Sequence, residues 1–96
     1  MIRVYTAEFS RIHDARYGSY HPHKAVHYIW WRKIATQVLH EAGYPQVDVI
    51  GLTLGHDDLV TDQHGQPLPD DQQRAILNEL TDLGIDEYWR ERENWD

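Results

Sequence analysis

Apolar and polar side chains alternate along the first residues of the chain. Ile2, Val4 and Thr6 fall on one side of this segment, and the residues between them fall on the other. This two-residue period, with its β-branched and aromatic side chains, is typical of a β-strand. We therefore expect a strand over residues 2–9, followed by a polar loop over residues 10–20 with at most one helical turn.

A helical period replaces the alternation between residues 22 and 42. Apolar residues recur there at intervals of three and four, which places them on one face of a helix. These residues are Tyr28, Trp31, Ala35, Val38 and Ala42. Pro22 suits the first position of a helix, and Gly43 suits the position just after the last turn. The pattern predicts one long helix over residues 22–42.

The rest of the chain predicts two further strands and two further helices. An apolar run over residues 47–54 predicts a strand, and residues 59–61 predict a shorter one. A leucine-rich stripe predicts a helix over residues 70–83 that begins at one of two aspartates. Residues 85–96 place apolar and aromatic side chains at helical spacing, so we expect a short C-terminal helix.

This order of elements predicts a single globular domain over residues 1–96 of the α+β or small α/β class. A two- or three-stranded sheet would pack against the long central helix (22–42), the second helix (70–83) and the short C-terminal helix. If the first two strands pair in parallel, the central helix is the crossover between them. An antiparallel meander is the alternative.

Charge is distributed unevenly along the chain. Residues 1–40 contain six Lys or Arg against two acidic residues, a net charge of +4, whereas residues 41–96 contain three against fourteen, a net charge of −11. Such asymmetry bears on partners rather than on fold. The chain has no cysteine, no signal-peptide run and no apolar stretch long enough for a membrane span. We expect a cytoplasmic protein that does not contact membranes.

Three closely spaced histidines form the sharpest chemical pattern. His23 and His27 are four residues apart, so on a helix their imidazoles would share one face and could hold a metal ion. His21 could supply a third ligand, and Asp14 or His13 a fourth. Lys24 lies inside the pattern and would repel a cation. Simple polar histidines at a helix start are the favoured interpretation, so we expect no cofactor, with a divalent metal as the alternative.

Catalytic motifs are absent from the sequence. It contains no Gly-x-Ser-x-Gly, no cysteine nucleophile, and no glycine pattern typical of phosphate or dinucleotide loops. An acid–base pair that forms only in space would leave no such trace. We therefore expect a non-catalytic protein, with a small His- or metal-dependent enzyme as the second alternative.

A basic and aromatic N-terminal face suggests nucleic-acid binding as the first alternative. Cationic side chains would contact phosphates while neighbouring aromatic rings stack on bases. The candidate cations are Arg11, Arg16, Lys24, Arg32 and Lys33. The overall charge of −7 disfavours this interpretation unless the basic face is segregated.

The preferred function is binding to a protein partner, as an inhibitor or adaptor. Carboxylates would give charge complementarity, and aromatic and aliphatic side chains outside the core would supply buried anchors. The expected contact residues are Val26, Ile29, Trp30, Lys33, Asp57, Asp58, Trp89 and Trp95. A homodimer is a further alternative. In size, acidity and lack of cysteine the chain resembles the inhibitor and accessory proteins of bacteriophages and other mobile elements.

Overall fold

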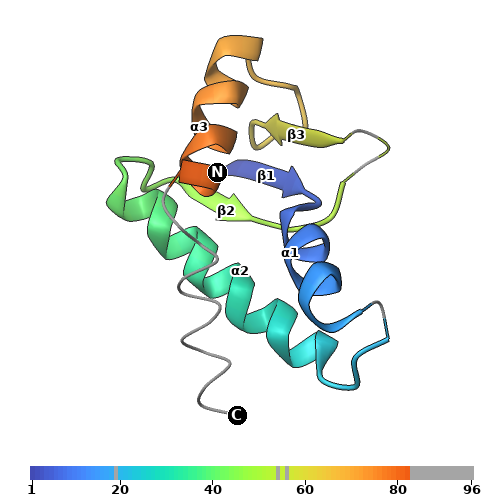
Figure 1. Cartoon of the computed structure of the whole chain (residues 1–96). Helices are drawn as coiled ribbons and strands as arrows, with labels where there is room; N and C mark the ends of the chain where they lie inside the picture. The colour runs from blue at the N-terminus through green and yellow to red at the C-terminus, as the bar shows by residue number, and fades with distance from the viewer. Residues whose placement is uncertain (19, 54, 56, 83–96) are drawn as a thin grey trace.

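The computed structural model describes residues 1–82 except residues 19, 54 and 56. Its elements follow in the order β1 (Ile2–Thr6), α1 (Glu8–Tyr17), α2 (Lys24–Glu41), β2 (Val47–Val49), β3 (Asp58–Thr61) and α3 (Asp70–Asp82) (Figure 1). This mixed sheet with three helices confirms the predicted small α+β fold. The helix expected over residues 85–96 lies outside the described residues.

The sheet has β1 at its centre, in the order β2-β1-β3. β1 pairs in parallel with β2 and antiparallel with β3. Val4 in β1 lies opposite both Val49 in β2 and Val60 in β3. Of the two predicted topologies the structure therefore has the parallel one, in which the connection from β1 to β2 contains α2.

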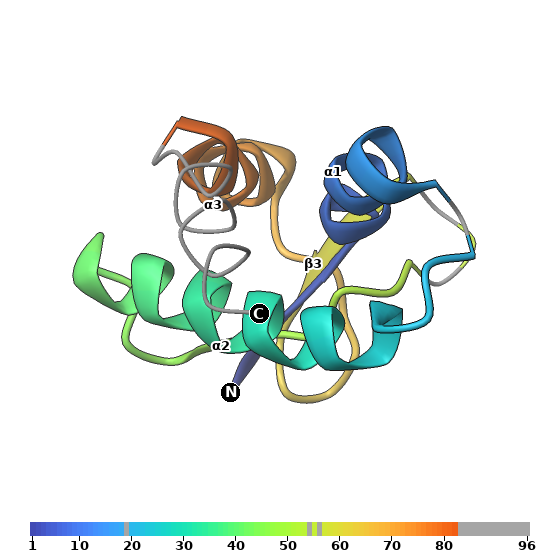
Figure 2. The same cartoon turned by 60° about the horizontal axis from the view of Figure 1, so that its bottom comes forward.

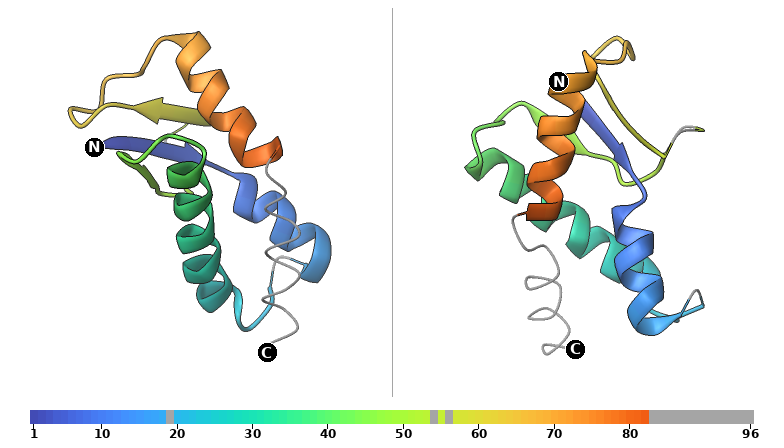
Figure 3. Two further views of the ribbon diagram at one scale, coloured as in Figure 1. Left: turned by 90° about the vertical axis from the view of Figure 1, so that its left-hand side faces the viewer. Right: turned by 45° about the horizontal axis from the view of Figure 1, so that its top comes forward.

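One hydrophobic core joins the sheet to the helices. Val4, Val49 and Val60 share one face because they are direct cross-strand partners, and Trp31, Ala35 and Leu39 of α2 and Ile76 and Leu80 of α3 belong to the same cluster. The largest contributors from the helices are Phe9, Trp31, Leu39, Ile76 and Leu80. Helices α2 and α3 therefore pack on this one face of the sheet (Figures 2 and 3).

Side chains of α2 hydrogen-bond to the outer edge of β2. Arg32 Nε donates to the carbonyl of Val49 at 2.7 Å, and Thr36 Oγ1 accepts the Val49 N–H at 3.3 Å. His40 Nε2 lies 2.9 Å from the carbonyl oxygen of Val47. The three side chains are four residues apart, so successive turns of one helix meet successive polar groups of the strand.

The outer edge of β3 is covered in a similar way. Gln73 in α3 accepts the Val60 N–H at its Oε1, 3.0 Å away, and the Leu68 N–H donates to the Val60 carbonyl at 3.0 Å. Backbone groups at both edges of the sheet thus find partners inside the same chain.

Gly43 ends α2, as its place in the sequence predicts. Its φ of +104° is left-handed, a conformation that glycine adopts without steric cost. The Tyr44 N–H donates to the Leu39 carbonyl at 2.9 Å, and the Gly43 N–H donates to the His40 carbonyl at 3.2 Å. This pair of bonds satisfies carbonyls that the last turn would otherwise leave unpaired.

Several of the predicted boundaries are wrong. The predicted loop over residues 10–20 is largely helix α1, and the first strand ends at Thr6, whose Oγ1 accepts the Glu8 N–H at 3.1 Å. The buried residues of α1 are Phe9 and His13, so the sequence shows no continuous apolar stripe there. β2 covers only the start of the predicted strand over 47–54, because Gly51 takes a left-handed φ of +92°.

Substitution of Gly51 tests how closely this turn approaches α2. A Cβ at this position would lie 2.7 Å from Tyr28 Cε2 and 3.2 Å from Trp31 Cζ3. Gly51→Ala should lower the free energy of unfolding by about 2–4 kcal/mol, because overpacking adds to the cost of the left-handed backbone. In urea unfolding the control Gly65→Ala, which has a similar φ of +81° and open space around it, should lose about 1 kcal/mol. Equal losses would contradict the close approach.

Asp62 makes the stability of the turn after β3 depend on pH. Its Oδ1 accepts the Gln66 N–H at 3.0 Å and the His64 N–H at 2.8 Å, and these bonds hold the pKa of Asp62 below its ordinary value. A carboxylate of this kind stabilises the fold above its unfolded pKa, about 3.9, and loses that contribution as the pH falls through the folded value. Asp62→Asn should therefore melt below the wild type at pH 7, and thermal scans should show the gap narrowing as the pH falls below about 3.9. A gap independent of pH would contradict this account.

Candidate metal centre

Aromatic packing brings α1 against the first half of α2. Phe9 of α1 makes edge contacts with Tyr28 and Trp31 of α2, with ring centroids 5.5 and 5.8 Å apart. Edge-to-face pairs at this separation are favourable because the positive ring edge meets the negative face. One turn further along α1, this packing places His13 opposite His27.

His13 and His27 meet through their ring nitrogens. His13 Nε2 lies 3.3 Å from His27 Nδ1, with His13 fully buried and His27 about 5% exposed. Two nitrogens bound to one tetrahedral zinc ion at about 2.0–2.1 Å are themselves about 3.3–3.4 Å apart. The same distance suits an N–H···N hydrogen bond in the metal-free protein.

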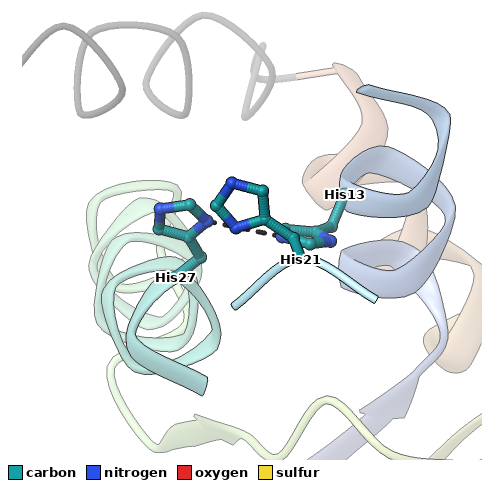
Figure 4. A group of neighbouring side chains, drawn as sticks. All are labelled: His13, His21 and His27. Atoms are coloured by element: carbon teal, nitrogen blue, oxygen red, sulfur yellow. Dashed lines mark hydrogen bonds between the residues drawn. The ribbon is translucent and has the colours of Figure 1, made fainter. Parts of the chain in front are cut away.

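His21 completes a cluster of three imidazoles from three parts of the backbone. It lies in the segment between α1 and α2, and its ring centroid is 5.7 Å from that of His13 and 5.1 Å from that of His27. One nitrogen from each residue lies within 4.8 Å of the other two. Figure 4 shows the three rings converging between the two helices. We call His13, His21 and His27 the three-histidine cluster.

A carboxylate supports the most buried imidazole from behind. His13 Nδ1 is 3.4 Å from Asp14 Oδ1, so Asp14 favours a proton on Nδ1 and leaves the Nε2 lone pair directed at His27. Ligating histidines usually have such a partner, which fixes the tautomer and the ring orientation. Lys24 Nζ donates to the same Asp14 oxygen at 3.0 Å.

Burial sets the protonation of this pair. Desolvation lowers the pKa of His13 below its ordinary value, more strongly than the contact with Asp14 raises it. The hydrogen bond from Lys24, and next the one from His13, lower the pKa of Asp14. Near neutral pH the cluster therefore combines a neutral His13 with an ionised Asp14, and a metal ion requires a neutral imidazole.

Aromatic rings surround the cluster on the α1 side. Phe9 stacks on His13 with centroids 5.1 Å apart and planes 17° from parallel. Tyr17 contacts all three histidines, at centroid separations of 4.5 to 5.2 Å. These contacts fix ring positions, as a preorganised ligand set requires.

The structure brings together two of the three histidines that spacing nominates. His21 and His27 belong to the cluster, whereas His23 is exposed and its ring centroid is 6.3 Å from that of His27. Helix α2 begins at Lys24, so His23 precedes its first turn. His13, considered in the sequence only as a fourth ligand, takes the central place. The signal for it was the four-residue spacing of Phe9, His13 and Tyr17 on α1.

Four of the expected partner-binding residues lie on helix α2. Val26, Ile29 and Trp30 are exposed on α2, by 49, 54 and 38%. Lys33 stands over the Trp30 ring at 5.5 Å. Ile29 and Lys33 also line a shallow groove of about 470 Å³.

The acidic members of that predicted set lie elsewhere. Asp58 accepts the Ala7 N–H at 3.2 Å and lies 3.5 Å from Arg11, so it holds the start of α1, while Asp57 is exposed. Trp89 and Trp95 lie outside the described residues.

Ion pairs engage Arg11, Lys24 and Arg32, which were nominated for nucleic-acid binding. Arg11 pairs with Glu8 at 2.8 Å, Lys24 with Asp14 at 3.0 Å, and Arg32 with Asp48 at 3.1 Å. A phosphate would have to displace carboxylates from the paired residues.

Comparison with known proteins finds no matching family model, no matching curated protein and no matching solved structure. None of the helices in residues 1–82 combines the length and apolar character that crossing a membrane requires. The functional argument therefore rests on the residues themselves.

Proposed function

We propose that this protein binds one divalent transition-metal ion, zinc in the first instance, at the three-histidine cluster. The observation that carries the proposal is the convergence of one nitrogen each from His13, His21 and His27 within 4.8 Å. The ligands come from α1, from the connecting segment and from α2, so an ion bound by all three would tie these parts together.

The chemistry of the cluster favours a metal ion over simple packing. Three imidazoles in contact cannot all become charged at low cost, and burial holds His13 neutral. A metal ion gives each lone pair a partner at once. The carboxylate of Asp14 behind His13 is the arrangement that supports ligating histidines in metalloproteins.

The three imidazole donors limit which metal ions suit the site. Imidazole nitrogen suits zinc, copper, nickel and ferrous iron, whereas magnesium and calcium prefer oxygen ligands. The chain has no cysteine, so a thiolate-rich site is excluded. Among the suitable ions, zinc binds three histidines in tetrahedral geometry without redox chemistry.

Metal titration of the untagged protein tests this proposal. Calorimetry should show one zinc ion per chain, and zinc should raise the melting temperature because it binds the folded state. His13→Gln and His27→Gln should each weaken zinc binding more than about 100-fold, since loss of a supporting residue alone costs 10–100-fold. Cobalt substitution should give a visible spectrum with the intensity of a tetrahedral site.

Two controls separate the cluster from other histidines. His64→Gln, in the exposed turn after β3, should leave zinc affinity unchanged within about twofold. His23→Gln distinguishes the cluster from the spacing-based set and should have a similarly small effect. Absence of zinc binding, or a loss in His23→Gln as large as in His13→Gln, would refute the proposal.

A second candidate function is docking of an acidic protein partner on the outer face of α2. The supporting observation is that Val26 and Ile29 are about half exposed beside the groove, while residues 24–40 contain no carboxylate. Exposed aliphatic side chains beside Lys33 suit an acidic partner with an apolar anchor.

Site-specific photo-crosslinking in cells that make the protein tests this docking face. A photoreactive residue at Ile29 should yield a discrete crosslinked product, and Lys33→Glu should reduce its yield about tenfold by reversing the charge beside it. The same probe at Ser10, exposed on α1, is the control. Equal yields from both positions would contradict the docking face, and a product of twice the chain mass would indicate a homodimer.

A further inference from the structure

Asp14 Oδ1 is shared between a ligand of the proposed metal site and a fixed positive charge. It lies 3.4 Å from His13 Nδ1 and 3.0 Å from Lys24 Nζ. Both members of the ion pair are about one third exposed, and Lys24 is the first residue of α2, three positions before His27. One cation therefore contacts the carboxylate that supports His13.

We propose that Lys24 limits the metal affinity of the three-histidine cluster, which makes it an exchangeable, regulatory site rather than a permanent one. The inference rests on the proposed metal-binding function and adds the mode of its regulation. The carboxylate of Asp14 increases the electron-donating power of His13 through the proton on Nδ1. A lysine on the same oxygen withdraws part of that charge and so weakens the ligand.

Charge around the cluster works in the same direction. Three neutral imidazoles leave the full double charge on a bound ion, and the charges of Asp14 and Lys24 cancel. The first turn of α2 contains no acidic residue, so the positive end of the helix dipole is also uncompensated there. Electrostatics at this site therefore permits binding but does not drive it strongly.

His21 supplies a route for exchange. Its Nδ1 accepts the His23 N–H at 3.2 Å, and its side chain is partly exposed, in contrast to His13 and His27. Coordination through Nδ1 would replace this hydrogen bond directly. Coordination through Nε2 would require a proton on Nδ1 and would remove the acceptor. In either case His21 gives up a contact when it binds the ion, so it is the ligand that leaves most readily.

The two members of the ion pair should affect zinc affinity in opposite directions. Competition with a chromophoric chelator at constant ionic strength should show that Lys24→Gln binds zinc on the order of tenfold more tightly, because a nearby positive charge is removed. Asp14→Asn should bind 10–100-fold more weakly, because His13 loses its supporting carboxylate. If the pair only held the local structure, both variants would weaken binding.

Two controls isolate the charge of Lys24. Lys24→Arg keeps the charge and should retain wild-type affinity, while Lys33→Gln removes a charge about two and a half turns further along α2 and should change affinity less than twofold. Melting of the metal-free variants verifies that each is folded. Stopped-flow release of zinc into excess chelator should be slower for Lys24→Gln than for the wild type.

The outcomes separate the two proposals. A wild-type chain that binds no zinc refutes the metal site itself. A wild type that binds zinc, together with Lys24→Gln of equal or lower affinity, refutes the limiting role of Lys24 and leaves the metal site intact.

Discussion

Burial of Trp31 and Leu39 against the valines of the sheet fixes the position of α2, and the rest of the structure depends on that position. Both side chains are completely inaccessible to solvent. Removing a side chain of this kind from a packed core costs several kcal/mol, so the helix has one stable placement. Once α2 is placed, one row of its side chains meets the edge of β2, and its first turns meet α1.

Helix α2 makes three different contacts with the rest of the fold. One face joins the core, the row Arg32, Thr36 and His40 holds the strand β2, and the first turns contribute Tyr28 and His27 to the contact with α1. Ion pairs inside the fold engage part of the positive charge of the N-terminal half. Arg11, Lys24 and Arg32 are engaged with carboxylates of the same fold, so the basic half of the sequence is partly neutralised internally.

Regularly spaced apolar side chains predicted several elements correctly. The central helix, the end of that helix at Gly43 and the helix after residue 70 all follow from side-chain spacing. Helix α1 was missed because its most buried side chain is His13, which a count of hydrophobic residues treats as polar. Phe9, His13 and Tyr17 have the four-residue spacing of a helix, but the polar His13 interrupts the apolar stripe.

Sequence spacing also predicted only part of the candidate site. Sequence spacing can nominate His23 and His27, because four residues make one turn of a helix. It cannot show that His13, fourteen residues before His27, lies closer, since that contact depends on the packing of Phe9 against Tyr28 and Trp31. The contact of Asp14 with His13 is equally invisible in the sequence, because it forms only when the histidine faces inward.

The hydrogen bonds at the two edges of the sheet have a consequence for how this chain meets other molecules. A strand from a second molecule adds to a sheet by pairing with exposed backbone groups. Here side chains from α2 and α3, and the segment after β3, already occupy those groups at Val47, Val49 and Val60. A strand that added to the sheet at Val49 or Val60 would therefore first have to displace bonds made within the chain.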